Sequence, residues 1–529
     1  MFTRDSVIIS RNIKTPLTSI SRAVGNTVYP SAEYLVRLIK PLFSNGEQGF
    51  FYDPNDLTTL YQDAAGTIDV LLTGQPVAYI KDLSGNNNHA KQLDSGKRPL
   101  LSSIPYFLDY DNVDDELGVD IVSQLTNCTV ITSNRTEPFS VQTGVTIPAG
   151  NYKVKPNRQM LVINRALNAL ELLTIEMRFK KYLTDSVVKQ SGGEQTVLYT
   201  AQGQPTYMNI IKKFDLSSID ASLSGTHPAF IVDGVEKPEI YIGTYQGKIV
   251  SGELLSLPNV DPTVSTNYDN FLNAARASGN GHHLITNAEW SAVALQCYKN
   301  GTQPMGNSYY GRSSEDPLLI GRRQDGLNPG NTAGSARTLT GSGPVQWRHN
   351  GKNNGIADLS GNVWEWNSGM RMVNGEIQVI ENNNAAKLTI DLSATSAQWK
   401  AIDGATGDLV TPLGGGATPG TVKFAASGTT ADYTIYGASF GAIKNLSTVN
   451  PVSAAALSKL KALCLFPHID AAATFNGDGL YLNLAIEAQP IRGGYWSYGS
   501  AAGVFCLYLN YARSNASPGL GSRPAFVNL

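Results

Sequence analysis

The sequence predicts a multidomain, β-rich α+β protein. Its 529 residues exceed the usual size of one domain, about 100–200 residues, so several folded units are expected. Charged residues make up 16% of the chain, against about 25% in ordinary globular proteins, while hydrophobic residues make up 42%. This composition provides ample core and favours strands and loops over coiled coils and long solvent-exposed helices.

The charge balance and the cysteine pattern exclude several classes of protein. Forty-one Lys and Arg against 43 Asp and Glu give a net charge of −2, so no overall field favours nucleic acid or an anionic membrane. The longest apolar runs are too short for membrane insertion. The first ten residues lack the apolar run of a signal peptide, and the four cysteines predict neither a zinc site nor a disulfide framework. We therefore expect synthesis in a reducing cytoplasm.

The N-terminal part of the chain is expected to contain two segments. Residues 1–49 are interpreted as an attachment or oligomerisation segment, with one helix over 31–42 supported by leucines at helical spacing. Residues 50–185 alternate short apolar stretches with polar turns, a spacing typical of a β-sandwich. Near its end, a helix is predicted over 164–183 from an apolar face formed by Leu167, Leu170, Leu173 and Met177.

The remainder is expected to contain a connector and one further domain. Residues 186–227 are interpreted as a connector with strands, and 228–529 as the second domain. All six tryptophans lie between Trp290 and Trp496, which indicates a core of different composition from that of the first half. Within this domain, residues 404–437 are rich in Gly, Thr and Ala, which predicts a loop insertion with little core.

Three short pieces of sequence occur in order in the expected sandwich. They are Asp-Leu-Ser-Gly-Asn at 82–86, Asn-Val-Asp-Asp at 112–115 and Arg-Ala-Leu at 165–167. At these residues the segment resembles the laminin-G-like, concanavalin-type sandwich that is common in phage tail proteins. The resemblance implies that fold for residues 50–185.

Two motifs characterise the second domain. Thr286 and Glu289 have the spacing of a capping box, which predicts a helix that begins within Asn-Ala-Glu-Trp at 287–290. The string Gly-Asn-Val-Trp-Glu-Trp at 361–366 predicts a strand with both indoles on one face and Glu365 on the other. Together these motifs resemble the formylglycine-generating-enzyme variant of the C-type lectin fold, over about residues 228–529.

That family includes oxidases and non-enzymatic binding proteins. The resemblance implies that the enzymes carry two closely spaced cysteines near the C-terminus, because thiolates hold their copper ion. The matching region of this chain offers Cys506 alone. We therefore expect no enzymatic activity, and we interpret Cys506 as a small buried hydrophobic residue.

The end of the chain contains a frame of residues that includes Ile491-Arg492-Gly493-Gly494, Trp496, Ala502-Gly503-Val504-Phe505 and Arg523-Pro524-Ala525. In this frame the segment resembles the variable segment of proteins diversified by diversity-generating retroelements, among them phage tropism determinants. The resemblance implies that residues between these frame positions form a variable ligand-binding site. These residues are Tyr495, Ser497, Tyr498, Ala501, Tyr508, Tyr511, Ser517, Gly519 and Ser522.

The composition of this segment favours a binding surface independently of the resemblance. From Gly494 to Ser522, 16 of 29 residues are Tyr, Ser, Asn or Gly, and from Ala488 onward there is no Asp, Glu or Lys. Such a composition is typical of antibody paratopes. Strand alternation predicts Tyr508 on one face and Phe505, Leu507 and Leu509 on the other. The alternative is that the tyrosines are half-buried strand residues that cover a β-rich domain.

The second domain contains two groups of candidate metal ligands. Adjacent His282 and His283 have no suitably spaced third ligand, so a surface pair is expected. Four other residues match positions at which relatives in the lectin-like enzyme family hold calcium through two side chains and two backbone carbonyl groups: Asp358, Gly361, Val363 and Glu365. The resemblance therefore implies a possible calcium cofactor there, and the alternative is a hydrogen-bonded loop beside the tryptophan core.

Together the resemblances imply a phage or prophage tail receptor-binding protein that adsorbs to a host cell-surface receptor, either a protein or a glycan. They further imply a homotrimer that contacts other tail proteins in the virion tail after synthesis in the bacterial host cytoplasm. The alternatives are a bacterial surface-displayed diversified binding protein and a formylglycine-generating-type enzyme.

Overall fold

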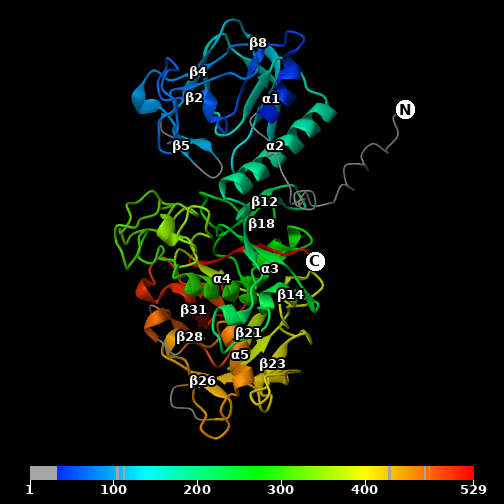
Figure 1. The fold of residues 1–529 in the computed structure, drawn as a ribbon, viewed down its shortest axis with the longest axis vertical. Coiled ribbons are helices and arrows are strands. Elements are labelled where there is room, and N and C mark those ends of the chain that lie inside the picture. The colour runs from blue at the N-terminus through cyan, green and yellow to red at the C-terminus, as the bar shows by residue number, and fades with distance from the viewer. Residues whose placement is uncertain (1–32, 103–105, 111–113, 427–430, 470–471, 476) are drawn as a thin grey trace, which may run out of the picture. The chain divides into compact units, whose positions relative to one another are not determined.

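The chain is divided into two compact, β-rich units, Met1–Tyr199 and Thr200–Leu529 (Figure 1). The boundary falls within the segment expected as a connector, 186–227. The start of the helix expected at 31–42 and part of the Asn-Val-Asp-Asp piece lie outside the described residues. The computed structural model describes residues 33–102, 106–110, 114–426, 431–469, 472–475 and 477–529.

Two antiparallel sheets share one core in the first unit. One sheet has the order β1-β11-β8-β9 and the other β10-β7-β4-β3-β2. Phe50 and Val162 from the first sheet and Leu60 and Val119 from the second lie in a common apolar cluster. The strands are β1 (Gly49–Tyr52), β2 (Leu60–Tyr61), β3 (Tyr79–Ile80), β4 (Ala90–Lys91), β7 (Leu117–Ile121), β8 (Leu125–Thr132), β9 (Ser140–Ile147), β10 (Gly150–Val154) and β11 (Met160–Ile163), with a separate hairpin of β5 (Leu100–Ser102) and β6 (Phe107–Asp109).

Helices α1 (Glu33–Ile39) and α2 (Ala169–Gln190) contribute to a second core on the other face of the four-stranded sheet. Leu35 and Ile39 of α1 and Phe179 of α2 lie in one cluster with Phe51 and Leu161 of the sheet. The other strand of this unit is β12 (Gln195–Tyr199).

The apolar face predicted for α2 is wrong. Leu170, Leu173 and Met177 are 72%, 48% and 50% exposed. The helix continues seven residues beyond the predicted end at Leu183, and the buried face is formed by Ile175, Phe179, Tyr182, Leu183 and Val187. Two apolar stripes are present in this helix, and packing against the sheet selects the stripe that carries the aromatic rings.

In the second unit, the last strand of the chain lies between two earlier strands. The order β13-β16-β33-β19 places β33 between β16 and β19. The predicted capping box is confirmed, because Thr286 Oγ1 accepts from the Glu289 N–H (3.1 Å) and Glu289 Oε2 accepts from the Thr286 N–H (3.0 Å). The elements are β13 (Pro205–Lys212), β16 (Glu239–Gly243), β19 (His282–Leu284), β33 (Pro524–Phe526), α3 (Tyr268–Ala277) and α4 (Asn287–Asn300).

The surface location expected for His282 and His283 is wrong. Both side chains are buried in β19. The His282 ring packs against Phe526, with centroids 4.9 Å apart, and His283 Nε2 lies 2.8 Å from Glu289 Oε1. Pairing with β33 therefore brings the Phe526 ring against His282, and the carboxylate of the α4 capping box holds His283 in the interior.

A five-stranded sheet has the order β28-β31-β30-β20-β32. It contains the Trp-Glu-Trp end of the 361–366 string and three strands of the variable segment. The predicted alternation in β31 is confirmed, because Phe505, Leu507 and Leu509 lie in one apolar cluster while Cys506 and Tyr508 contact another. The predicted placement of both indoles of β20 on one face is also confirmed. The strands are β20 (Trp364–Trp366), β28 (Leu480–Leu482), β30 (Ile491–Gly493), β31 (Gly503–Leu509) and β32 (Leu520–Ser522).

Residues 404–437 do not form a loop with little core. They supply β24, β25 and β26 to an eight-stranded sheet, and Val422, Phe424 and Ile435 are buried in the main cluster of the unit. These widely spaced apolar residues acquire a core only by pairing with strands outside the segment. The sheet contains β21 (Met370–Val373), β22 (Glu376–Val379), β23 (Lys400–Ile402), β24 (Leu409–Val410), β25 (Lys423–Phe424), β26 (Thr434–Tyr436), β27 (Lys444–Asn445) and β29 (Glu487–Ala488).

The remaining elements of the second unit are short. Two hairpins and one helix complete it: β14 (Ile231–Val232) with β15 (Val235–Glu236), β17 (Gly247–Val250) with β18 (Glu253–Ser256), and α5 (Ala454–Ala462). Over the part of the chain that the structure describes, no helix is long and apolar enough to cross a membrane.

Candidate ligand-binding site

Seven aromatic side chains gather beside β20, β28 and β31. Contacting pairs have ring centroids 4.8–6.4 Å apart, within the range of stacked and edge-to-face arrangements. We call this group the ring cluster. Its members are Trp364, Tyr481, Tyr495, Trp496, Tyr498, Tyr508 and Tyr511.

Strand register explains why residues distant in sequence meet here. Tyr481 of β28 is the parallel partner of Tyr508 in β31, so their rings lie on the same face with centroids 5.0 Å apart. Trp364 of β20 contacts Tyr508 at 5.1 Å and Tyr498 at 4.8 Å. Tyr511 lies two residues beyond the end of β31, and its ring centroid is 5.2 Å from that of Tyr508. The sheet therefore forms a single aromatic surface from three strands and one loop.

The ring cluster is neither fully buried nor fully exposed. The Trp364 side chain is 5% exposed, Tyr481 is 37% exposed, and the other five rings are half-buried. Burial raises the pKa of the Tyr498 hydroxyl well above its ordinary value, with a smaller effect of its hydrogen bond to Tyr481. Burial likewise raises the pKa of Tyr511. The hydroxyl groups of Tyr498 and Tyr511 are therefore neutral at physiological pH and can both donate and accept hydrogen bonds.

Backbone hydrogen bonds hold the loop that carries three of these rings. The Trp496 N–H donates to the Asn362 carbonyl oxygen (3.2 Å), and the Tyr310 N–H donates to the Trp496 carbonyl oxygen (2.6 Å). The Gly499 N–H donates to the Ser308 carbonyl oxygen (2.9 Å). None of these bonds uses a side chain of the loop, so they are compatible with other residues at its tyrosine and serine positions.

Most of the other predicted site residues lie near the same loop. Ser497 and Ala501 are half-buried within it, and Ser517 is half-buried with its Oγ accepting from the Gly519 N–H (3.3 Å). Gly519 is buried, and a Cβ at this position would lie 3.1 Å from the Tyr495 ring. Gly519 therefore contributes backbone against the cluster and no displayed side chain.

Ser522 is not brought to this surface. It is fully buried in β32, and its Oγ lies close to Gly247, so that a Cβ on Gly247 would be 3.2 Å from it. The other eight predicted residues lie in or beside the loop and strand end that carry the tyrosines.

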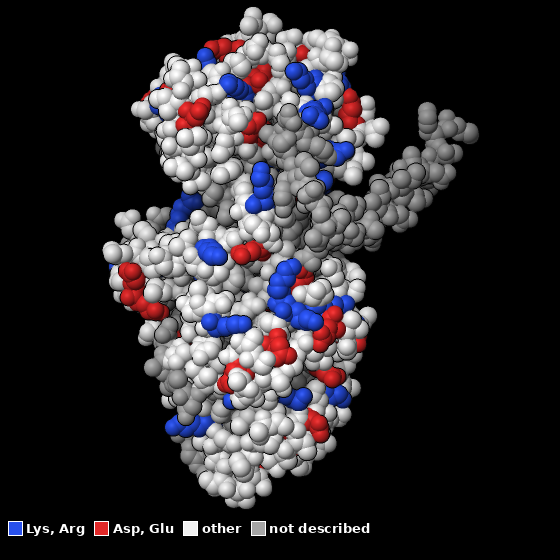
Figure 2. All heavy atoms as spheres, in the orientation of Figure 1, with Lys and Arg blue, Asp and Glu red and all other residues white. Residues whose placement is uncertain are grey.

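Two arginine side chains near the ring cluster form ion pairs with aspartates. Arg513 Nη2 lies 2.9 Å from Asp269 Oδ1, and Arg337 Nε lies 2.8 Å from Asp261 Oδ1. The Arg337 guanidinium also lies 5.8 Å from the Trp496 ring centroid. On the molecular face drawn in Figure 2, basic and acidic side chains are interspersed among uncharged residues. The cluster therefore offers rings and hydroxyl groups rather than a field of one sign.

Sequence reasoning missed Tyr481 and the supporting role of Trp364. Tyr481 lies between Leu480 and Leu482, which is the same apolar–Tyr–apolar alternation that Tyr508 shows between Leu507 and Leu509. That repeated pattern was the available signal. The pairing of β28 with β31, which brings the two tyrosines together, has no local signature.

Three of the four residues matched to a calcium site, Asp358, Val363 and Glu365, lie around the side chain of Gln246. Gln246 Nε2 donates to the backbone carbonyl oxygens of Asp358 and Val363 (3.1 Å each) and lies 3.0 Å from Glu365 Oε1. Gly361 adopts φ +72°, and a Cβ there would approach the Asn307 carbonyl oxygen to 2.2 Å, so glycine is required. We call residues 358–365 the amide-centred loop.

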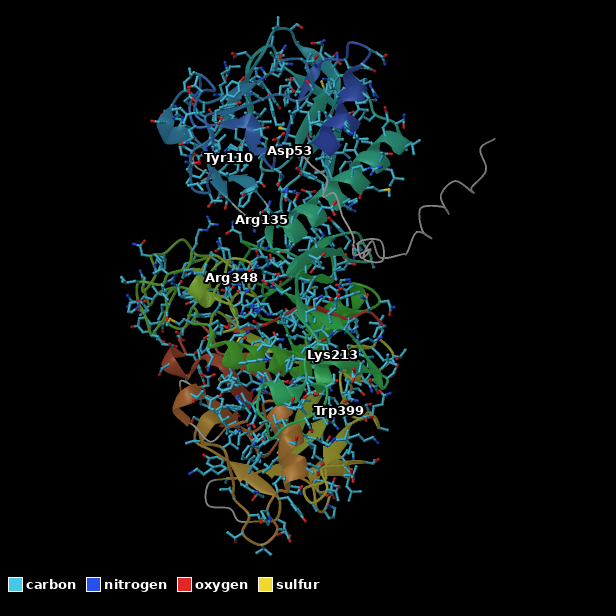
Figure 3. The ribbon with its side chains drawn as sticks, viewed as in Figure 1. Asp53, Tyr110, Arg135, Lys213, Arg348 and Trp399 are labelled. Carbon is cyan, nitrogen blue, oxygen red and sulfur yellow. The ribbon has the colours of Figure 1, made fainter. Side chains whose placement is uncertain are left out.

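Arginine side chains flank the amide-centred loop. Arg523 is fully buried and binds both carboxylate oxygens of Glu365, with Nη2–Oε1 at 2.7 Å and Nε–Oε2 at 2.9 Å. Arg348, labelled in Figure 3, donates to the Gly341 carbonyl oxygen (2.8 Å), and the Gly341 N–H donates to Asp358 Oδ2 (2.7 Å). Across the described residues, no group of three or more His, Cys, Asp or Glu side chains is arranged to hold a metal ion.

No protein-family model and no curated protein sequence match the chain. Among solved structures, the Major Tropism Determinant I1 variant is 11% identical over 87% of this chain and 89% of its own, with a TM-score of 0.23. The U1 variant is 10% identical over 85% of this chain and 92% of its own, also with a TM-score of 0.23. A TM-score this low does not establish a shared fold.

Proposed function

We propose that this chain is a phage or prophage tail receptor-binding protein that adsorbs to a host-surface ligand through the ring cluster. One observation carries the proposal: half-buried rings occupy a segment whose loop is held by backbone hydrogen bonds. Tyrosines supply large contact area at low entropic cost, and Ser, Asn and Gly adapt their hydrogen bonds. Recognition by such a surface requires no bond-making chemistry.

The proposal includes diversification of the site. The frame residue Arg492 is fully buried and donates to Asn287 Oδ1 (2.7 Å) and to the Cys464 carbonyl oxygen (3.1 Å), so it ties β30 to the interior. Substitutions at Tyr495, Tyr498 or Tyr511 leave such frame contacts in place. Loss of a ring contact costs about 0.5–1.5 kcal/mol, which is small against the total stability of a domain, about 5–15 kcal/mol, so host range could change without loss of the fold.

In this proposal the second unit is a C-type-lectin-like domain of the formylglycine-generating-enzyme type, and the first unit is a laminin-G-like sandwich. The ligand is a host protein or glycan, and other tail proteins hold the chain in the virion tail. Assembly as a homotrimer would present three ring clusters, and avidity would let weak single sites retain a phage on a cell.

Binding to cells tests the role of the ring cluster. The full-length chain is labelled fluorescently and incubated with a panel of bacterial strains, and retention on cells is read by flow cytometry. Replacing Tyr498 and Tyr508 together by Ala should reduce retention on a responsive strain at least tenfold, because two large contact surfaces are lost. Tyr436→Ala is the matched control, because Tyr436 is half-buried in β26 outside the cluster. Equal loss in both variants, or none in either, would contradict the proposal.

Neighbouring DNA tests the diversification. A reverse-transcriptase gene and a near-copy of the codons for residues 491–525, differing from them at adenines, are expected beside the coding sequence. A locus that lacks both would limit the proposal to a receptor-binding protein of fixed specificity.

A further inference from the structure

The amide-centred loop has the oxygen atoms of a cation site, but a side-chain amide lies among them. Two of the implied ligand atoms, the Val363 carbonyl oxygen and Glu365 Oε1, lie 3.0–3.1 Å from Gln246 Nε2, and so does the backbone carbonyl oxygen of Asp358. The Asn362 amide donates in turn to Gln246 Oε1 (2.7 Å), which fixes the orientation of the Gln246 side chain with its NH₂ group toward the loop. The group at the centre of these acceptors is therefore a hydrogen-bond donor.

This donor set does not fit a calcium ion. Calcium takes about six to eight oxygen ligands at about 2.3–2.6 Å, and each must direct a lone pair at the ion. The NH₂ group of Gln246 donates to two of the oxygens that would have to do so, the Val363 carbonyl oxygen and Glu365 Oε1. An ion at that position would face N–H hydrogens, which carry positive partial charge, and the amide would have to leave its buried position with the loss of its hydrogen bonds.

The carboxylate of Glu365 is also engaged. Arg523 binds both of its oxygens, and it further donates to the carbonyl oxygens of Gly243 and Ala357, each at 2.8 Å. The single negative charge of Glu365 is thereby balanced by a guanidinium that makes four hydrogen bonds, two to Glu365 and two to backbone carbonyl oxygens. Asp358 Oδ1 has no hydrogen-bond partner among the described residues, but one oxygen falls far short of a calcium coordination shell.

We infer that Gln246 and Arg523 take the place of a divalent cation in the amide-centred loop, so that the loop is held without metal. Gln246, which lies between β16 and β17, bonds both ends of the loop. Arg523, the residue directly before β33, bonds Glu365 of β20. Trp364 lies between two of the bonded residues, Val363 and Glu365, and supports three of the ring-cluster tyrosines. The geometry of the ring cluster is therefore independent of calcium.

Thermal unfolding in EDTA and in millimolar CaCl₂ tests the inference. The wild type should melt at the same temperature in both buffers. Gln246→Ala removes the amide donor of the Asp358 and Val363 carbonyl oxygens and the acceptor of the Asn362 amide, so it should melt about 3–8 °C lower, by the same amount in both buffers. Gln378→Ala is the matched control, because Gln378 is equally buried and its amide bonds Glu376 and Arg371, outside the loop.

The outcomes separate clearly. A wild type that melts higher in CaCl₂ than in EDTA, together with a Gln246→Ala variant whose deficit disappears in CaCl₂, would overturn the inference. If CaCl₂ raised the melting temperature of the wild type and of both variants by the same amount, the ion would bind elsewhere in the chain. Because the Gln246→Ala deficit would then persist, that result would support the inference. None of these results depends on cell binding, so this test and the test of the proposed function can fail independently.

Discussion

Truncation of rings on the two faces of β31 distinguishes a displayed surface from a core. Phe505 is fully buried, with its ring centroid 5.0 Å from that of Phe475 and 5.4 Å from that of Phe440. Removal of such a ring costs about 3–5 kcal/mol. Tyr508 is half-buried, so Tyr508→Ala should cost about half as much, roughly 2 kcal/mol. Among the described residues the Tyr511 ring contacts one other ring, that of Tyr508, whereas Tyr508 contacts three, so Tyr511→Ala should cost less than Tyr508→Ala, roughly 1–2 kcal/mol. The expected order of destabilisation is therefore Phe505, Tyr508, Tyr511.

Urea unfolding followed by tryptophan fluorescence measures this order in the relevant unit. All six tryptophans lie in residues 200–529, so the signal reports that unit even when the first unit unfolds separately. Phe505→Ala and Tyr511→Ala should differ by about 2–3 kcal/mol in the free energy of unfolding. Equal costs of 3 kcal/mol or more would show that the tyrosines belong to the core, and the binding surface would have to be abandoned.

Three further predictions concern buried charge. Arg523→Met should destabilise the second unit by about 3–5 kcal/mol in urea unfolding, because it leaves the Glu365 carboxylate buried without its partner; a cost below about 1 kcal/mol would contradict this. Burial raises the pKa of Asp478 from 3.8 to about 7, so the folded state retains a proton that the unfolded state has released. The wild type should therefore lose stability relative to Asp478→Asn as pH rises from about 4 to 7, measured as the difference in unfolding free energy. Burial lowers the pKa of His227 from 6.5 to about 3, so the unfolded state is protonated first as pH falls. His227→Gln should lose less stability than the wild type between about pH 6 and 4, and parallel pH profiles would refute the assignment.

The features that were predicted correctly depend on neighbours in the sequence. The capping box at Thr286 requires residues three apart, and the two faces of β31 follow from alternation over five residues. The placement of both indoles of β20 on one face has the same origin. Helix and strand geometry relate such residues directly, so no knowledge of the rest of the fold is needed.

The predictions that failed depended on a partner element. The apolar stripe of Leu170, Leu173 and Met177 was a plausible buried face for α2, but the four-stranded sheet packs on the opposite stripe. The segment 404–437 looked poor in core because its apolar residues are far apart and become a core only through strands β22 and β23. His282 and His283 carry no local sign of burial; strand β33, from the end of the chain, provides it.

The ring cluster and the amide-centred loop also combine features that the sequence predicted with features that depend on distant strands. The amino-acid sequence by itself determined that the last forty residues carry tyrosines and small polar residues without Asp, Glu or Lys, since composition is independent of folding. Tertiary structure alone decided that Tyr481 joins them, that Ser522 is buried, and that Gln246 reaches the amide-centred loop from 112 residues away or more. The physical reason is that a ring surface and a buried hydrogen-bond network are made by strand pairing between distant segments, and the pairing is selected by the packing of the whole unit.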